Sequence, residues 1–397
     1  MMRPILLLSV SLPLVLFGGC GKKEPVEEVP VNPNLKYEIK GDAATITGCD
    51  KKASGALIIP VTIEGKLVTS IGDKAFAYCS GLTSITIPDG VTSIGRIAFE
   101  RCTSLTSITI GNGVTSIGDY AFSSCGSLIS IDVSAGNVNY TDVNGVLFNK
   151  EKTELIAYPK GKTGTNYTIP DGVTSIGEGA FAKCKNLTSI TIPDGVTSIE
   201  GYTFKDCTSL TSITIPDSVT SIGRYAFSSC SSLTSITIPD GVTSIGAGAF
   251  SSCSSLTSIT IPDGVTSIGG GAFRDCTSLT SVTIGNSVTS IGNTAFLACT
   301  SLTSITIPDG VTSIGQQAFF GCSSLTSITI PDSVTSIGGQ AFQYCEGLIA
   351  VTFLGDAPKA GERVFLRATS TIYRKPEAKG WGDTFAGRPV KLISEKP

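Results

Sequence analysis

The sequence predicts a repeat solenoid, a stack of similar coils, and three observations carry this prediction. Cysteines recur every 23 residues in two runs, and most of their neighbours recur with them. Serine and threonine alternate with isoleucine in most units, as in a half-buried β-strand. A turn sequence, usually Pro-Asp-Gly, follows that strand. Such a unit buries its apolar side only by stacking on the next one. The two runs are Cys79, Cys102 and Cys125, then Cys184, Cys207, Cys230, Cys253, Cys276, Cys299, Cys322 and Cys345.

One unit, residues 82–104, shows how each part of a coil is expected to form. Its sequence is LTSITIPDGVTSIGRIAFERCTS. After the alternating strand and the turn, residues 91–94 predict a second short extended stretch. Phe99 and Cys102 have the i, i+3 spacing of one helical turn. The side chains expected inside the coil are Leu82, Ile85, Ile87, Val91, Ile94, Ala98, Phe99 and Cys102.

Composition and charge exclude several classes of function. The chain has 397 residues and carries 29 Lys+Arg against 32 Asp+Glu, a net charge of −3. A surface of this charge argues against nucleic-acid binding, which requires a basic surface. The chain contains no histidine, which excludes Ser-His-Asp and Cys-His catalysis and His-ligated zinc. We therefore expect neither an enzyme nor a cofactor.

The N-terminal residues have the layout of a secretory signal. Arg3 precedes an apolar stretch that ends in two glycines and Cys20. The sequence Phe-Gly-Gly-Cys at residues 17–20 resembles the lipobox of bacterial lipoproteins, which implies removal of residues 1–19 and lipidation of Cys20. Residues 20–35 then form a flexible tether. The resemblance implies a lipid-anchored, surface-exposed protein of the bacterial cell envelope; a periplasmic or secreted protein is the alternative.

The repeat unit also resembles a known family. Its LxxIxI core resembles a leucine-rich repeat, and LTSITIPDGVTSIG followed by Ala-Phe and a cysteine resembles the BspA-like bacterial surface proteins. The pattern occurs eleven times, over residues 68–353. The resemblance implies a right-handed coil with a parallel β-sheet on one face and short helical turns on the other. It also implies a non-enzymatic cell-surface protein that mediates adhesion or protein–protein binding.

The segments that break the repeat fit the same family. Residues 36–67 resemble its N-terminal β cap, and residues 354–397 resemble its terminal segment. Residues 134–170 resemble a longer irregular unit, because Cys125 and Cys184 are separated by one ordinary step and one enlarged step. End coils need covers for their apolar surfaces, so Trp381 and Tyr373 are expected in the core of the C-terminal cap.

The recurring cysteines and aspartates are expected to be structural. Stacked cysteines point their Cβ atoms in parallel, whereas a disulfide needs them to converge, so we expect buried free thiols. Cys49 lies outside this series. The turn aspartates, from Asp89 to Asp332, place one carboxylate in each turn. Calcium binding is the alternative to a simple turn role, but a dedicated site needs several converging ligands, and no metal site is predicted.

The strand hydroxyls form the candidate ligand face. Ser and Thr keep an exposed sheet soluble, and this role does not exclude a ligand that lies across them. The expected partner is an extracellular protein; the alternative is a surface module that binds a glycan or another polymer. The candidate residues are Ser84, Thr86, Ser107, Thr109, Ser212, Thr214, Ser235, Thr237, Ser258, Thr260, Ser304 and Thr306.

Overall fold

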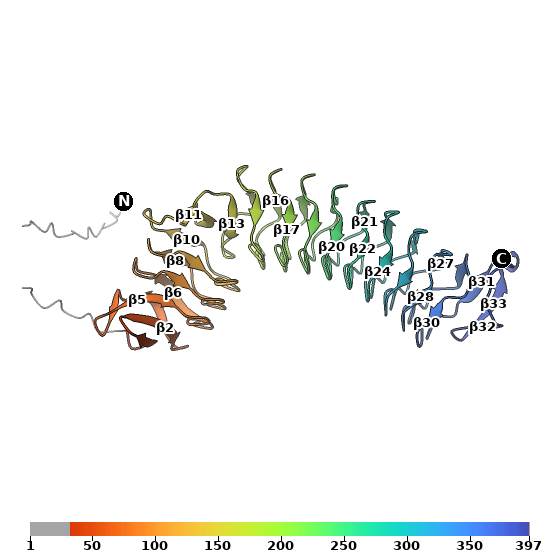
Figure 1. The fold of residues 1–397 in the computed structure, drawn as a ribbon, viewed down its shortest axis with the longest axis horizontal. Coiled ribbons are helices and arrows are strands. Elements are labelled where there is room, and N and C mark those ends of the chain that lie inside the picture. The colour runs from red at the N-terminus through yellow and green to blue at the C-terminus, as the bar shows by residue number, and fades with distance from the viewer. Residues whose placement is uncertain (1–31, 397) are drawn as a thin grey trace, which may run out of the picture.

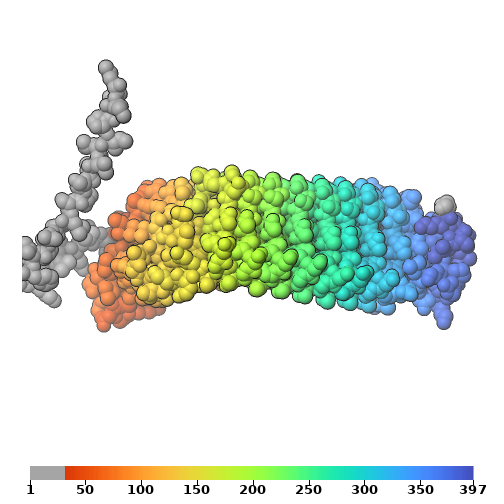
Figure 2. All heavy atoms as spheres, turned by 90° about the horizontal axis from the view of Figure 1, so that it is seen from above, coloured from red at the N-terminus to blue at the C-terminus, as the bar shows by residue number. Residues whose placement is uncertain are grey.

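The computed structural model describes residues 32–396 and shows one curved stack of coils (Figure 1). The predicted signal, Cys20 and most of the tether lie outside the described residues. In the space-filling view the coils form a continuous rod (Figure 2). Within residues 32–396, no helix is long and apolar enough to cross a membrane. The predicted solenoid of 23-residue units with parallel sheets is confirmed.

The N-terminal cap and the first run of coils contain the first ten strands. These are β1 (Leu35–Lys40), β2 (Ala43–Cys49), β3 (Ser54–Ile58), β4 (Thr62–Ile63), β5 (Lys66–Ile71), β6 (Gly81–Thr86), β7 (Ser93–Ile94), β8 (Ser107–Ile110), β9 (Ser116–Ile117) and β10 (Ser130–Val133). Two sheets run through this part, in the orders β10-β8-β6-β3 and β1-β2-β5-β7-β9. Each coil therefore contributes a main strand to one sheet and a two-residue short strand to the other.

The irregular coil and the second run continue this arrangement. The irregular coil contains β11 (Tyr140–Val143), β12 (Val146–Asn149) and β13 (Glu154–Ala157). The later main strands are β14 (Asn166–Thr168), β16 (Ser189–Thr191), β18 (Ser212–Thr214), β21 (Ser258–Ile261), β23 (Ser281–Ile284), β25 (Ser304–Ile305) and β27 (Ser327–Ile330). The short strands are β15 (Ser175–Ile176), β17 (Ser198–Ile199), β19 (Ser221–Ile222), β20 (Ser244–Ile245), β22 (Ser267–Ile268), β24 (Ser290–Ile291), β26 (Ser313–Ile314) and β28 (Ser336–Ile337).

The two sheets differ in continuity along the second run. The short strands form one sheet of eight strands, from β17 to β30 (Lys359–Ala360), whereas the main strands form separate sheets. The expected strand at residues 235–237 is absent, although its side chains keep the alternating burial pattern. The bond from one threonine N–H to the same threonine of the previous coil also varies more in the main row, where it is 2.9 Å at Thr211. In the short-strand row this bond is 2.9 Å at Thr243, whereas in the main row it stretches to 3.4 Å at Thr326.

Both ends of the stack are covered. Strand β1 pairs antiparallel with β2 at the N-terminal end. The C-terminal end contains β29 (Ala350–Phe353), β31 (Thr371–Arg374), β32 (Thr384–Phe385), β33 (Arg388–Leu392) and a 3₁₀ helix, η1 (Ile393–Glu395). Trp381 packs against Phe353 with tilted rings whose centroids are 4.9 Å apart, and it donates its indole N–H to the Gly355 carbonyl. Tyr373 is buried. Both aromatic side chains thus belong to the core of the cap, as expected.

The interior of the rod is a set of stacked identical side chains, and the phenylalanines form the largest of these columns. Neighbouring rings from Phe181 to Phe365 lie 5.3–5.4 Å apart and nearly parallel in most pairs. A shorter stack joins Phe76, Phe99 and Phe122. We call these the two phenylalanine stacks. They are separated by the irregular coil, where the apolar core also divides into two clusters.

The corner around each phenylalanine does not form the helical turn that the spacing of phenylalanine and cysteine predicted. The Phe250 N–H donates forward to the Ala272 carbonyl of the next coil, while the Cys253 N–H closes a local turn onto Phe250. Gly248 and Ser252 adopt positive φ values of 64° and 60°. A right-handed helix cannot pass through left-handed residues at these positions, so the segment forms consecutive turns.

Close contact between coils explains the glycine that precedes this corner. A Cβ atom on Gly246 would lie 2.6 Å from the backbone nitrogen of Arg224 and 2.7 Å from the carbonyl carbon of Gly223. These are backbone atoms of the preceding coil, which cannot rotate away as a side chain could. Only a residue without a Cβ fits this approach, so Gly246 sets how closely the corners stack.

Candidate binding surfaces

The structure places the predicted hydroxyl residues in parallel rows along the main strands. Ser212 pairs in register with Ser189, and Thr214 pairs with Thr191. The same register joins Ser281 to Ser258 in the next sheet. We call these the hydroxyl rows. Those of the second run are exposed, whereas three of the four candidates in the first run are half-buried.

The hydroxyl rows are open to a partner. None of the twelve predicted hydroxyls makes a side-chain hydrogen bond within residues 32–396. A neighbouring column of threonines behaves differently, because the Thr211 hydroxyl donates to the Thr188 carbonyl at 3.1 Å. The hydroxyl rows therefore offer unused donors and acceptors at regular intervals, while the neighbouring column links one coil to the next.

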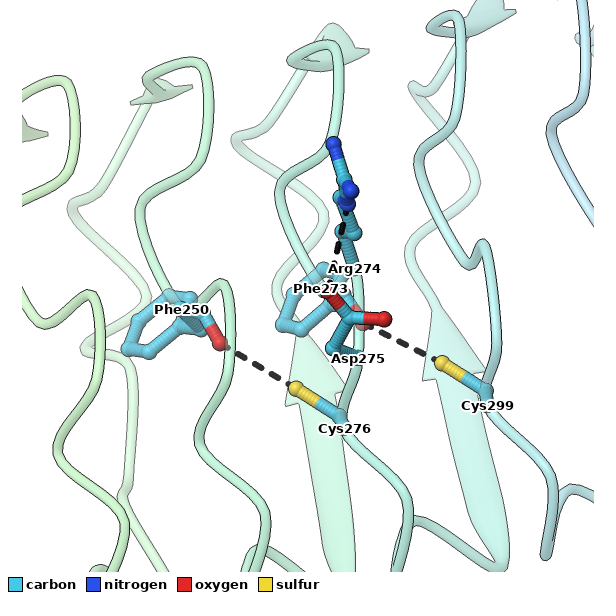
Figure 3. Close-up of polar contacts among 6 residues, drawn as sticks. All are labelled: Phe250, Phe273, Arg274, Asp275, Cys276 and Cys299. Atoms are coloured by element: carbon cyan, nitrogen blue, oxygen red, sulfur yellow. Dashed lines mark hydrogen bonds and ion pairs between the residues drawn. The ribbon is translucent and has the colours of Figure 1, made fainter.

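The cysteines form a hydrogen-bonded column inside the rod. The Cys276 thiol donates to the Phe250 carbonyl of the preceding coil at 3.1 Å, and Cys299 donates likewise to Phe273 (Figure 3). Every cysteine from Cys49 to Cys345 is free and buried. Burial raises the pKa of Cys276 to about 12, so this thiol remains a protonated donor. Within residues 32–396 they are structural groups rather than disulfides, as expected.

A second candidate surface, which the sequence did not predict, lies at the irregular coil. Tyr158 takes the place of a phenylalanine there: its ring stacks on Phe181 at 5.1 Å and its N–H donates to the Ala180 carbonyl. Leu155 pairs with Ile176 as the corresponding short-strand residue. Leu155 is thus three residues before Tyr158, whereas Ile176 is five residues before Phe181. The irregular coil therefore lacks two residues of its corner.

The missing corner leaves a hollow of about 440 Å³, which we call the notch. Its walls are the corners of the two flanking coils, Asp119 and Tyr120 on one side and Glu178 and Gly179 on the other. Gly179 matters for the shape, because a Cβ atom there would lie 3.0 Å from the Tyr120 ring. Other lining residues include Asn139, Tyr140, Asn149, Glu154, Ala157 and Lys160.

Lys160 takes over the role of the missing cysteine thiol in the notch. Its Nζ donates to the Phe122 carbonyl at 3.2 Å, the type of acceptor that a cysteine thiol uses in regular coils. Two carboxylates, Asp119 and Glu154, line the same hollow. A third, Glu178, forms an ion pair with Arg224 at 3.2 Å. The notch is therefore polar, and Lys160 offsets only part of the negative charge of Asp119 and Glu154.

Two tyrosines line the notch, and a hydrogen bond of its hydroxyl holds one of them. Tyr140 donates its hydroxyl to the Thr115 carbonyl at 3.3 Å. Burial and a hydrogen bond to the Glu178 carboxylate raise the pKa of Tyr120 above its usual value. The two-residue shortening between Leu155 and Tyr158 was the available signal for this site, and it becomes visible only when Tyr158 is aligned with the phenylalanines.

The fold and these surfaces define a class of protein: a leucine-rich-repeat solenoid with an open hydroxyl face. The sequence matches the BspA type leucine-rich repeat region (6 copies) over residues 69–163, 157–280 and 248–371. The chain therefore belongs to the BspA-type leucine-rich repeat family. Proteins of this family are generally non-enzymatic, and they are generally cell-surface proteins of bacteria.

Two solved structures illustrate the likeness. A leucine-rich repeat protein from Bacteroides ovatus is 27% identical, with a TM-score of 0.57, 91% of this chain covered and 99% of that chain. A leucine-rich cell surface protein from Faecalibacterium prausnitzii is 33% identical, with a TM-score of 0.53 and coverages of 81% and 94%. A search of curated proteins finds no match. The comparisons thus support a binding or adhesion role in general terms.

Proposed function

We propose that this protein is a lipid-anchored adhesin that holds an extracellular protein against the hydroxyl rows and performs no catalysis. The observation that carries the proposal is the set of exposed hydroxyls, unpaired within residues 32–396 and repeated in register along the second run. One hydroxyl contributes only about 1 kcal/mol as a hydrogen bond, so one coil binds weakly. A rigid rod of equal sites binds a long partner through simultaneous contacts.

Removing whole coils tests this mechanism. Deletion of residues 233–255 removes one unit. The two units on either side then meet through the same kind of junction as before, so the solenoid can still fold. We expect affinity for immobilised laminin, collagen or fibronectin to fall stepwise as one, two and three such units are removed, as measured by surface plasmon resonance. Thr237→Ala, which removes one hydroxyl, should change the affinity less than about threefold. Full binding after removal of three units would rule out the hydroxyl rows.

The anchor has a separate test. If Cys20 is lipidated, the mature protein partitions with membranes, because several acyl chains on one residue hold it firmly. We expect Cys20→Ala to release the protein or leave its signal uncleaved, as read by membrane fractionation and intact mass. An unmodified N-terminus on the mature wild-type protein contradicts the lipoprotein assignment without affecting the hydroxyl rows.

A further inference from the structure

The notch has the size and the polar lining of a small-molecule site. Its volume of about 440 Å³ falls within the range of ligand pockets. Regular coils close the same corner with two additional residues, and this hollow lies where those residues are missing. We propose that the notch binds one neutral sugar residue of an extracellular glycan.

The aromatic lining favours a sugar ring. Tyr120 and Tyr140 both line the notch, and both are partly buried. The Tyr140 hydroxyl is fixed on the Thr115 carbonyl, and the Tyr120 ring lies close to Gly179, where a Cβ atom would come within 3.0 Å, so both rings have little freedom to turn. A pyranose presents C–H groups on its ring faces, and these pack on the electron-rich face of an aromatic ring. Ordered rings therefore suit a sugar at low entropic cost.

The polar lining favours hydroxyl groups over other polar ligands. The side chains of Asp119, Asn139 and Glu154 make no hydrogen bond inside the part of the chain that the structure describes. Carboxylate and amide groups bind vicinal hydroxyls through paired donors and acceptors. Lys160 supplies the cation of the lining. One of its N–H groups donates to the Phe122 carbonyl, and the others can donate to a ligand.

The charge of the lining favours a neutral sugar over an anionic one. The lining contains one lysine and three carboxylates, of which Glu178 is paired with Arg224. A sulfated or uronic-acid chain would meet Asp119 and Glu154 without enough positive charge to balance it. A neutral residue avoids this repulsion and uses the same carboxylates as acceptors. The notch is also distinct from the hydroxyl rows, because it gives one site per chain rather than one per coil.

The direct test is a titration of the full chain in a detergent that contains no sugar. Neutral glucan, galactan and mannan oligosaccharides are compared with polyuronate and heparin fragments by isothermal calorimetry. We expect at least one neutral oligosaccharide to bind with a stoichiometry of one. Tyr120→Ala and Tyr140→Ala should each weaken it about tenfold through loss of stacking. Tyr344→Ala, a half-exposed tyrosine far along the rod, is the matched control and should leave binding unchanged.

Two further variants separate loss of the site from loss of the fold. Ala157→Trp adds a large side chain to the lining of the notch and should abolish binding. Glu154→Gln keeps the size of the side chain and should weaken binding. Thermal unfolding must match the wild type in each. The proposal is overturned if no neutral sugar binds at about 10 mM, if only anionic chains bind, or if binding survives Ala157→Trp. Binding that falls with deletion of residues 233–255 but not with Ala157→Trp overturns it in favour of the hydroxyl rows.

Discussion

Raising the pH from about 8 to about 11 should unfold the rod steeply. Burial raises the pKa of Cys184 and Cys276 to about 12, and it raises the pKa of five neighbouring thiols well above the usual value. In the unfolded chain a thiol loses its proton near pH 8.5. The thiols therefore stabilise the fold fully below about pH 8.5, and this stability is lost as the pH rises toward 12. Each thiol contributes about 1.4 kcal/mol per pH unit to the slope.

Urea unfolding under anaerobic conditions between pH 7 and pH 10.5 measures this slope. Replacing Cys253 and Cys276 together by alanine should reduce the slope by about two protons, although it also lowers stability at neutral pH. A thiol reagent supplies the second measurement: the thiols should resist it in the folded protein and react after denaturation without a reductant. A flat pH profile, or denatured protein without free thiols, contradicts the picture of a protonated column.

Phe250→Ala should be among the most destabilising single substitutions in the chain. Phe250 is fully buried between Phe227 and Phe273, at centroid distances of 5.3 and 5.4 Å. The backbone of its coil is hydrogen-bonded to the coils on both sides, so neighbouring side chains cannot collapse into the cavity. We expect the free energy of unfolding to fall by about 3–5 kcal/mol, as measured by urea denaturation.

Phe320→Ala is the matched control for this substitution. Phe320 follows a stacked phenylalanine in a later coil, but its ring is only half-buried and contacts Tyr344 edge-on at 5.2 Å. Its removal should cost clearly less, about 1 kcal/mol, because the side chain leaves no closed cavity. Equal losses for both variants would mean that the phenylalanine stack does not dominate the stability of the rod.

The repeat made most of the interior predictable, because a fixed period converts one buried position into a column. Phe99 and Cys102 were expected inside the coil from a single unit, and both are fully buried. Their i, i+3 spacing also predicted a helical turn, which does not form. The reason lies outside any one unit, since the Phe99 N–H donates to Ala121 of the next coil. Bonds between units are invisible in the pattern of one unit.

The two candidate surfaces differ in how much of each could be predicted from the sequence. The hydroxyl rows follow from strand alternation, so their exposure was predictable, although the missing strand at residues 235–237 was not. The notch depends on a length difference within a segment that matches no other unit. Recognising it requires knowing that Tyr158 replaces a phenylalanine, and the ring contact with Phe181 and the N–H bond to Ala180 establish that equivalence.

The uniform junctions of the second run have a consequence for how such a gene can change. Neighbouring units are nearly identical in amino-acid sequence, so loss or gain of a whole 23-residue unit recreates the junction that was there before. Each event alters the reach of the rod by one ring spacing, 5.3–5.4 Å, while the covers at both ends and the notch stay intact. The length of the rod can therefore change by single coils without a new kind of junction.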